Sequence, residues 1–295
     1  INMKNNKISV CICSRDFNKN LIKLLEVIKK EYNPLRYSIH ISIIFNFSKK
    51  IDLIKLKEIK KTLSPISYKI LYEKKTGVSY ARNKYLDYIK NKKVEYCCFI
   101  DDDCLIQKNF FLNHLKFIKK ERCRIVTGPQ IYKSKLIFFR LLERQFIDRK
   151  IVKWAATNNV FFKKSILRKN LFFSEKVTKY GFGEDQLFFS KLSKSGEQIK
   201  WLNNKVYEVV QKDRQNIYWF LKRNYFFGLT GYLIDKELYG NYYGILINIA
   251  KSIIYLLKMI GNLPLIIFHP KKFLLLSLSN IIRSAGRIIG LKNIF

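Results

Sequence analysis

The alternation of apolar, β-branched runs with helical repeats over the first hundred residues is the feature that most constrains the fold. It predicts strands at 7–13, 37–47, 67–72 and 96–100, and helices at 21–28, 51–63 and 77–89. It further predicts a helix at 110–119, a strand at 124–127, a helix at 186–194 and strand segments between 199 and 210. This order of elements is typical of a mostly parallel sheet covered on both faces. We therefore expect an α/β fold whose ligands bind outside the carboxyl ends of the strands.

Three consecutive acids, Asp101, Asp102 and Asp103, follow directly on the predicted strand at 96–100. Because side chains alternate along an extended chain, Asp101 and Asp103 are expected on the same side. Two carboxylates suit Mg²⁺ or Mn²⁺, which keeps several waters and takes further ligands from a substrate diphosphate. The alternative is a polar turn that only caps the end of the strand.

A second acidic pair, Glu184 and Asp185, follows Gly181 and Gly183 at the predicted start of a helix. The glycines permit backbone angles that other residues avoid, and the helix dipole stabilises a carboxylate in the first turn. A carboxylate held there can act as a general base that takes a proton from an attacking hydroxyl. The alternative is an ordinary helix cap.

Two groups of arginines are candidate ligand contacts. Gly77 opens a predicted helix that carries Arg82 one turn inside, which suits a phosphate or a sugar, although a solvated arginine gives the same pattern. Arg214 and Arg223 lie in a later stretch rich in Tyr, Trp and Phe. That stretch fits either an RNA-stacking surface or a helix packed on the catalytic domain.

The net charge of +35, from 57 Lys and Arg against 22 Asp and Glu, suggests nucleic acid at first sight. The lysines are dispersed along the whole chain beside abundant Ile, Asn, Phe and Tyr, so a biased composition also explains them. A basic nucleic-acid-binding protein leaves the three aspartates unexplained, because they would repel phosphate. We keep that class as an alternative and expect no nucleic acid partner.

The six cysteines, at 11, 13, 97, 98, 104 and 123, include no CxxC pair, and the three histidines lie in unrelated contexts. This pattern argues against a zinc site. It favours reduced cysteines that serve as small apolar side chains in a cytosolic protein. No long apolar stretch opens the sequence, so we expect no signal peptide.

The composition changes after Glu237, the last acidic residue. From 238 to 295 the charged residues are Lys251, Lys258, Lys271, Lys272, Arg283, Arg287 and Lys292, in an otherwise strongly apolar segment. We expect two amphipathic helices, split near His269-Pro270, that lie in a membrane interface and are attracted by anionic lipid. A transmembrane helix at 244–268 and a helical subdomain packed on the core are the alternatives.

Taken in order, these segments resemble an inverting family 2 glycosyltransferase of the GT-A fold, in particular the bacterial succinoglycan biosynthesis proteins of the ExoM type. The resemblance covers about 7–231 and is carried by SVCICSR at 9–15, GVSYARN at 77–83, FIDDDC at 99–104, ATNNVFF at 156–162, GFGEDQLFF at 181–189 and VYEVVQKDR…WFLKR at 206–223. Each motif alone is loose, but their joint order and spacing are specific.

The resemblance implies a donor site at the strand ends. Asp101 and Asp103 match the DxD positions that contact the nucleotide and bind Mn²⁺ or Mg²⁺, with Asp102 between them. The other residues implied on the donor side are Ser14, Asn46, Arg82, Asn83 and Arg214. The family commonly has an acid after its second strand that contacts the nucleobase. Here phenylalanines occupy those positions and Asn46 is the polar residue that is left.

The resemblance also implies an acceptor site. Asp185 matches the base that activates the acceptor hydroxyl, with Glu184 as its neighbour, and Trp154, Asn158 and Asn159 fall on the acceptor side. The implied reaction moves a sugar from a nucleotide-sugar to a lipid-linked or polysaccharide acceptor in envelope or exopolysaccharide assembly. One displacement would invert the configuration at the anomeric carbon.

The expected organisation is a GT-A catalytic domain at 1–231 and a helical, basic, apolar extension at 232–295. The expected location is the cytoplasmic face of the inner membrane, with peripheral attachment to its anionic surface. A sugar-nucleotidyltransferase is the rival enzyme class. It would need a glycine-rich, basic loop after the first strand, and Ser14-Arg15-Asp16-Phe17 is not such a loop.

Overall fold

The computed structural model describes residues 6–47, 51–167 and 170–292, and these divide into two compact units. The first unit holds the described residues up to 133 together with those of 144–175 and 188–209. The second unit holds those of 134–143, 176–187 and the chain from 210 onward. The chain therefore passes between the units several times.

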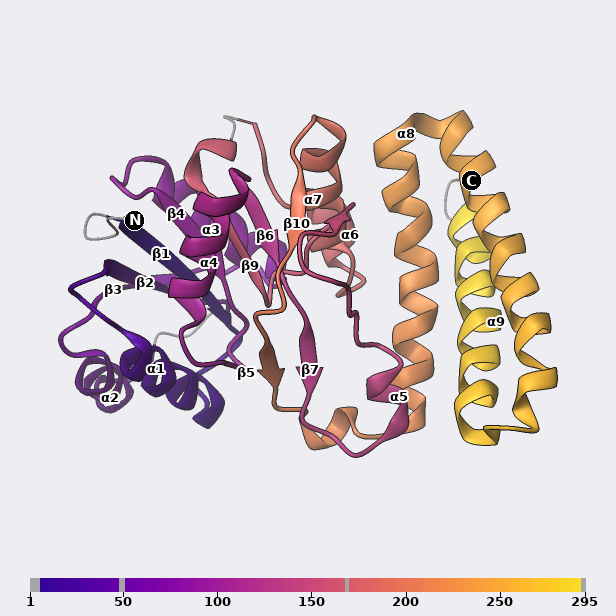
Figure 1. Ribbon diagram of the computed structural model, residues 1–295, viewed down its shortest axis with the longest axis horizontal. Helices are drawn as coiled ribbons and strands as arrows, with labels where there is room; N and C mark the ends of the chain where they lie inside the picture. The colour runs from indigo at the N-terminus through magenta and orange to yellow at the C-terminus, as the bar shows by residue number, and fades with distance from the viewer. Residues whose placement is uncertain (1–5, 48–50, 168–169, 293–295) are drawn as a thin grey trace. The chain divides into compact units, whose positions relative to one another are not determined.

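The first unit is built on an eight-stranded, mostly parallel sheet (Figure 1). Its strands are β1 (Asn6–Ser14), β2 (Tyr37–Phe45), β3 (Ser67–Tyr72), β4 (Tyr96–Phe99), β6 (Ile125–Thr127), β8 (Ile151–Val152), β9 (Val160–Lys163) and β10 (Ile199–Trp201). Their order in space is β3-β2-β1-β4-β9-β6-β10-β8. The first four strands are parallel, whereas β9 runs antiparallel between β4 and β6. A second sheet has the order β5 (Cys104–Ile106), β11 (Val206–Glu208), β7 (Gln130–Tyr132).

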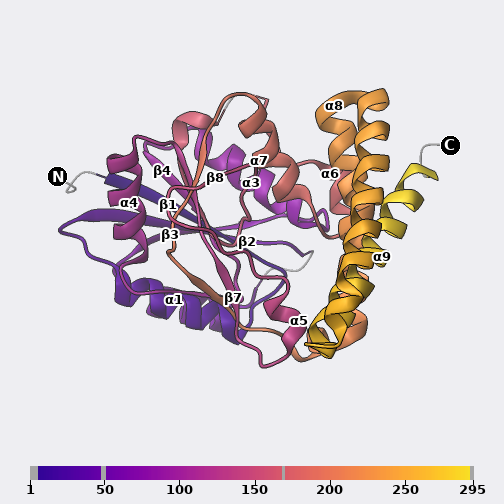
Figure 2. The same cartoon turned by 45° about the vertical axis from the view of Figure 1, so that its right-hand side comes forward.

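Helices cover both faces of the large sheet because the strand side chains on both faces are apolar. On β1, Val10 and Ile12 enter the core formed with α1 (Lys19–Glu31), α2 (Leu53–Leu63) and α4 (Phe110–Glu121). Cys11 enters the opposite core, formed with α3 (Val78–Lys90) and the later part of α7 (Glu184–Lys194). Figure 2 shows α1 and α3 on opposite sides of the strands. The α/β fold with a mostly parallel sheet is thus confirmed.

The strands and helices predicted in the first hundred residues are confirmed with small differences at their ends. The strand predicted at 37–47 ends at Phe45, and the helix predicted from residue 51 begins at Leu53. Asp52 explains the later start, because its carboxylate accepts a hydrogen bond from the Lys55 backbone nitrogen at 2.9 Å and caps the helix.

The second unit consists mainly of long helices. α8 (Ile217–Asn262) reverses direction at Gly240, where φ is 81° and ψ is 177°, so it comprises two helices (Figure 1). α9 (Pro270–Lys292) follows. The shorter elements are α5 (Ile137–Arg140), α6 (Glu175–Thr178), η2 (Lys212–Arg214) and η3 (Pro264–Ile266), with η1 (Lys164–Ile166) in the first unit.

The apolar C-terminal extension is helical, as predicted, and its break near His269-Pro270 is confirmed. The reversal at Gly240 is an additional break. The predicted domain boundary between 231 and 232 falls inside α8 and remains a prediction. In the part of the chain that the structure describes, α8 and α9 are the two helices long and apolar enough to cross a membrane.

His114 on α4 is a fully buried histidine in the core of the first unit. Its ring stacks on Phe161 with the centroids 5.2 Å apart, and Nδ2 of Asn204 lies 2.7 Å from its Nδ1. Burial lowers the pKa of His114 from 6.5 to about 4, because the protonated ring would place a charge in an apolar core.

We expect the folded state to lose stability as the pH falls from 6.5 towards 4. In this range the unfolded chain binds a proton at His114 and the folded chain does not, so acid favours unfolding, by about 2 kcal/mol at pH 5. His114→Phe keeps an aromatic ring and should remove this part of the pH dependence. Urea denaturation of both proteins at pH 7 and pH 5 measures the effect. An unchanged pH dependence in the variant would contradict it.

Candidate active site

Polar residues follow three neighbouring strands at one edge of the large sheet. β1 ends at Ser14, Asn46 comes directly after β2, and the aspartates follow β4. Because β1 pairs in parallel with both β2 and β4, the carboxyl ends of the three strands meet. The structure therefore brings these donor-side candidates of the first unit to the edge where ligands of such sheets bind.

The three aspartates form a tight turn rather than the extended continuation that was predicted. The turn is closed by a hydrogen bond from the Cys104 backbone nitrogen to the Asp101 carbonyl oxygen at 3.1 Å. The turn that the sequence offered as an alternative is thus present. Its three carboxylates nevertheless lie in different surroundings, so a capping role does not account for all of them.

Asp102 connects the turn after β4 with the end of β1 and the start of α1 through hydrogen bonds. Its Oδ2 accepts hydrogen bonds from Ser14 Oγ at 2.5 Å and from Asn18 Nδ2 at 2.8 Å. Asn18 also caps α1, because its Oδ1 accepts from the Leu21 backbone nitrogen. Burial raises the pKa of the Asp102 carboxyl, and the two hydrogen bonds oppose this rise. Ser14 is itself buried, so its hydroxyl holds Asp102 in place.

Asp101 lies beside a buried arginine. Nη2 of Arg82 is 3.5 Å from Asp101 Oδ1, and the two side chains are 5% and 38% exposed. The Arg82 guanidinium also lies 5.5 Å from the ring centroid of Phe173. The arginine is therefore fixed by its surroundings and adds a positive charge next to the most exposed acid of the turn.

Asp103 is nearly buried, and its Oδ1 lies 3.8 Å from Cys104 Sγ. The pKa of Cys104 is raised, first by burial and then by the negative charges of Asp103, Asp101, Glu208 and Asp102. The negative charges of four carboxylates thus act on the Cys104 thiol at this edge. Glu208, which pairs opposite Cys104 on β11, was not recognised in the sequence, because a three-residue strand gives no readable period.

The donor set of this edge fits a hard divalent cation. In the described ranges, no three His, Cys, Asp or Glu side chains are grouped as a metal cluster. Asp101 and Asp103 can supply carboxylate oxygens to Mn²⁺ or Mg²⁺, and such ions commonly complete their shell with water and phosphate oxygens.

Asn46 and Asn83 both bind backbone around the start of α3. Nδ2 of Asn46 donates to the Lys75 carbonyl oxygen at 2.7 Å, and the Gly77 backbone nitrogen donates to Asn46 Oδ1 at 2.9 Å. Asn83 exchanges two hydrogen bonds, of 2.9 and 2.8 Å, with the backbone of Phe173. These carboxamides fix the chain on either side of Arg82, and a direct contact with a donor remains a prediction for both.

Asn158 and Asn159 directly precede β9, whose first residue pairs with Phe99 at the end of β4. Asn159 is fully buried, and its Nδ2 donates to the carbonyl oxygens of Pro129 at 3.0 Å and Asn204 at 2.8 Å. Its side chain thus supports the neighbouring backbone. Asn158 is 6% exposed.

Trp154 is half-buried in the first unit. The guanidinium of Arg144 lies 3.8 Å from the centroid of its ring, which is a close cation–π contact. The contact fixes one face of the indole, and its place in an acceptor site remains a prediction.

Glu184 and Asp185 belong to the second unit, where they form the first turn of α7. Gly181 and Gly183 before them have φ of 72° and 94°, in the left-handed region that favours glycine. Glu184 is 6% exposed and Asp185 is half-buried. The predicted position at a glycine-framed helix start is confirmed, and the role as base remains a prediction. Arg214, in η2 of the same unit, is half-buried.

The sheet order, the crossover helices and the acidic turn after β4 define a GT-A-like fold. Residues 9–179, more than half of the chain, match the sequence model described as glycosyl transferase family 2. The chain belongs to this family.

Solved structures show the same fold. The mannosyltransferase PcManGT from Pyrobaculum calidifontis, in complex with GDP-Man and Mn²⁺, matches over 98% of this chain and 87% of its own, with a TM-score of 0.62 and 15% identity. TarS from S. aureus matches over 78% of this chain, with a TM-score of 0.55 and 17% identity. The fragment 1–349 of TarS, in complex with UDP-GlcNAc, matches with a TM-score of 0.56 and 15% identity. This chain spans 39% of the TarS chain.

Among curated proteins, Protein Ycf2 of Physcomitrium patens is 29% identical over 246 residues. The match covers 77% of this chain but 10% of that protein, so it carries no role from one to the other. The ExoM-type branch remains a prediction.

Asp102→Ala should lower the free energy of unfolding by about 1–3 kcal/mol, because the hydrogen bonds from the buried Ser14 and the half-buried Asn18 to a charged acceptor would be lost, which leaves them the Asp16 carbonyl oxygen. Asp87→Ala on the surface of α3 is the matched control and should change it by less than about 0.5 kcal/mol. Urea denaturation measures both variants. Equal losses would show that Asp102 does not hold the edge together.

Proposed function

We propose that the protein is an inverting glycosyltransferase that moves a sugar from a nucleotide-sugar to an acceptor hydroxyl. The observation that carries the proposal is the acidic turn after β4 with Arg82 beside it, in a chain of glycosyl transferase family 2. Two proteins of the same fold, PcManGT and TarS, have been solved with GDP-Man and UDP-GlcNAc. Family membership favours sugar transfer over a sugar-nucleotidyltransferase or a nucleic-acid-binding protein.

On the donor side, Asp101 and Asp103 would hold Mn²⁺ or Mg²⁺. When bound, the ion supplies positive charge that stabilises the diphosphate leaving group. Arg82 adds a fixed positive charge at the same edge, and it is effective because it is buried and held in place before the donor arrives. Asp102 keeps the turn in position through Ser14 and Asn18.

On the acceptor side, Asp185 is the proposed general base, with Glu184 beside it. It takes the proton of the acceptor hydroxyl as that oxygen attacks the anomeric carbon. The new glycosidic bond forms while the bond from the anomeric carbon to the diphosphate oxygen breaks on the opposite face, so the configuration inverts. Trp154 and Asn158 are the proposed acceptor contacts, and Asn159 positions their segment through its backbone bonds.

We propose a uridine or guanosine nucleotide as the donor, the two carried by the solved proteins of the same fold. Asn46 occupies the position where the family commonly has an acid, but its carboxamide is bonded to the backbone around Lys75 and Gly77. We therefore assign Asn46 an indirect effect on the donor, through the loop that opens α3. Ser14, Asn83 and Arg214 remain proposed donor-side residues.

The proposed acceptor is a lipid-linked sugar or a polysaccharide of the cell envelope, and the proposed location is the cytoplasmic face of the inner membrane. Support comes from the apolar helices of the second unit. In this proposal residues 1–231 carry the catalysis and 232–295 attach the enzyme to the membrane.

Incubation of the protein with a panel of nucleotide-sugars and Mn²⁺ should show slow hydrolysis of one donor, with water as the acceptor. Asp103→Ala should abolish hydrolysis and the Mn²⁺-dependent thermal shift caused by the matching nucleotide. Asp185→Asn should lower hydrolysis about 100-fold, as expected for loss of a general base, and leave that thermal shift unchanged.

Asp87→Asn, at an exposed position of α3, is the matched control and should hydrolyse the donor at the wild-type rate. Full hydrolysis by Asp103→Ala or Asp185→Asn would refute the corresponding assignment. No hydrolysis of any donor by the wild type, together with no nucleotide-dependent thermal shift, would refute the proposed activity itself.

A further inference from the structure

The long helices of the second unit have an inverted distribution of polarity. Asp235, Asn248 and Arg287 are buried, with exposed fractions of 2%, 0% and 5%. Several serines are buried with them, at 252, 277, 279 and 284. A helical subdomain stabilised by water would instead bury its apolar side chains and expose these polar ones. The inversion therefore indicates a surrounding medium that is less polar than water.

The polar groups form one hydrogen-bonded network around Asp235 and a separate pair, Arg283 with Asn224. Nη1 of Arg287 lies 2.9 Å from Asp235 Oδ2 and 2.9 Å from Asn248 Oδ1. Nζ of Lys251 lies 2.7 Å from Asp235 Oδ1. Nε of Arg283 donates to Asn224 Oδ1 at 2.6 Å. Three cations that were expected to attract anionic lipid are thus bonded to partners within the unit, two of them to an acid, although the Lys251 side chain stays 42% exposed.

Small residues bring these helices close together. A Cβ on Gly228 would overlap the carbonyl oxygen of Arg283, and a Cβ on Gly286 would overlap that of Tyr225. Glycine contacts of this kind are typical of helices that pack in a membrane, where the polar atoms of neighbouring helices bond to one another.

The outward side of the same helices is apolar. We define the outer apolar face as Leu246, Ile253, Leu257 and Ile260 of α8 with Ile281 and Ile288 of α9. Their exposed fractions lie between 41% and 61%. In 241–262, all of which is described, the charged residues are Lys251, whose side chain is 42% exposed, and Lys258, which is exposed. A helix that lies in the interface keeps a polar face towards water. Here the two lysines share one face, and Lys251 is bonded to Asp235 within the unit, so Lys258 is the cation left to face water.

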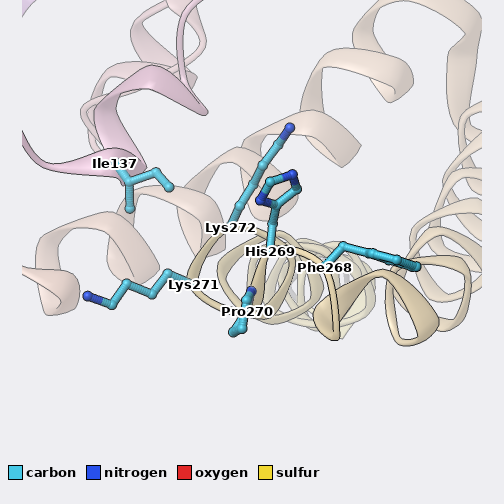
Figure 3. A pocket seen from close by; sticks show the side chains of 6 residues that line it. All are labelled: Ile137, Phe268, His269, Pro270, Lys271 and Lys272. Atoms are coloured by element: carbon cyan, nitrogen blue, oxygen red, sulfur yellow. The ribbon is translucent and has the colours of Figure 1, made fainter.

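The ends of the two helices carry the residues that are common at membrane interfaces. Tyr239, Tyr242 and Tyr243 are exposed around the reversal at Gly240. The opposite end has a cavity of about 480 Å³, lined by Ile137, Phe268, His269, Pro270, Lys271 and Lys272 (Figure 3). Aromatic residues and lysines at the two ends match the headgroup levels of a bilayer. The 22 residues of 241–262, the second helix of α8, span about 33 Å, close to the roughly 30 Å of a hydrocarbon core.

We infer that residues 241–292 are embedded in the hydrocarbon layer of the membrane through the outer apolar face, with the Asp235–Arg287 pair buried inside the unit and Lys251, whose side chain is 42% exposed, bonded to Asp235. The attachment is hydrophobic, in place of the electrostatic attachment to an anionic surface expected from the sequence. Embedding rests on the membrane location proposed above, whereas the sugar-transfer chemistry would not be affected by its failure.

Flotation of the full chain with vesicles of neutral phosphatidylcholine tests the embedding. The protein should float with the vesicles in 1 M NaCl and in alkaline carbonate, because apolar burial is not screened by salt. The double variant Ile253→Glu/Leu257→Glu should reduce the bound fraction at least tenfold. The matched control Lys271→Glu/Lys272→Glu, which places two acids at the start of α9, should leave the bound fraction within twofold of the wild type.

Release of the wild type by salt, or binding lost only in the lysine variant, would overturn the embedding in favour of surface adsorption. If the glutamate variant binds like the wild type and turns a lipid-free dimer into a monomer, a second copy covers the face and the embedding is wrong. Donor hydrolysis, measured on the same samples, separates this outcome from a failure of the proposed activity.

Because the glutamate variant could fail to fold, one tryptophan added to the three of the chain gives a second test, read as the difference from the wild type. Leu257→Trp should gain fluorescence that lipids with brominated chains quench by at least half. Tyr218→Trp, exposed on α8 outside the outer apolar face, should gain fluorescence that these lipids do not quench. Equal quenching, or none at either position, would overturn the embedding.

Discussion

The hydrogen bonds from Ser14 and Asn18 to Asp102 connect three parts of the chain: the end of β1, the cap of α1 and the turn after β4. A buried carboxylate is costly unless it has donors, so this arrangement holds only when all three parts are in place. It is this constraint that fixes the position of the turn and, with it, of Asp101 and Asp103. The two acids proposed to bind the metal are thus held in place by a third, Asp102.

Around α3, too, some side chains bind the backbone and thereby hold the residue that is proposed to contact the ligand. Asn46 binds the backbone before the helix and Asn83 binds the backbone that lies against it, so the segment that carries Arg82 is fixed on both sides. An acid at position 46 could not donate to a carbonyl oxygen as the carboxamide does. The departure from the family at this position therefore has a structural explanation, because Asn46 both donates and accepts in its loop.

Much of the fold could be predicted, because each early strand is a long apolar run and each helix has a clear repeat. The antiparallel direction of β9 could not be predicted, since a buried apolar run such as 160–162 does not reveal which way its strand runs in the sheet. The acids after β4 were recognisable because a buried strand rarely ends in three of them. Glu208 was not recognisable as part of the site, because its strand has three residues and gives no readable period. The pairing of Asp235 with Arg287 was also hidden, because the partners are 52 residues apart.

Asp235 lies before the acid-free segment, and both of its cationic partners lie within it. A chain that ends between Asp235 and Lys251 would keep a buried carboxylate without its counter-ions. Removing one partner of such a buried pair typically costs about 3–5 kcal/mol. Truncations that remove Arg287 should therefore reduce the amount of folded protein in the cell. The segment up to Arg287 thus contributes to the stability of the folded unit.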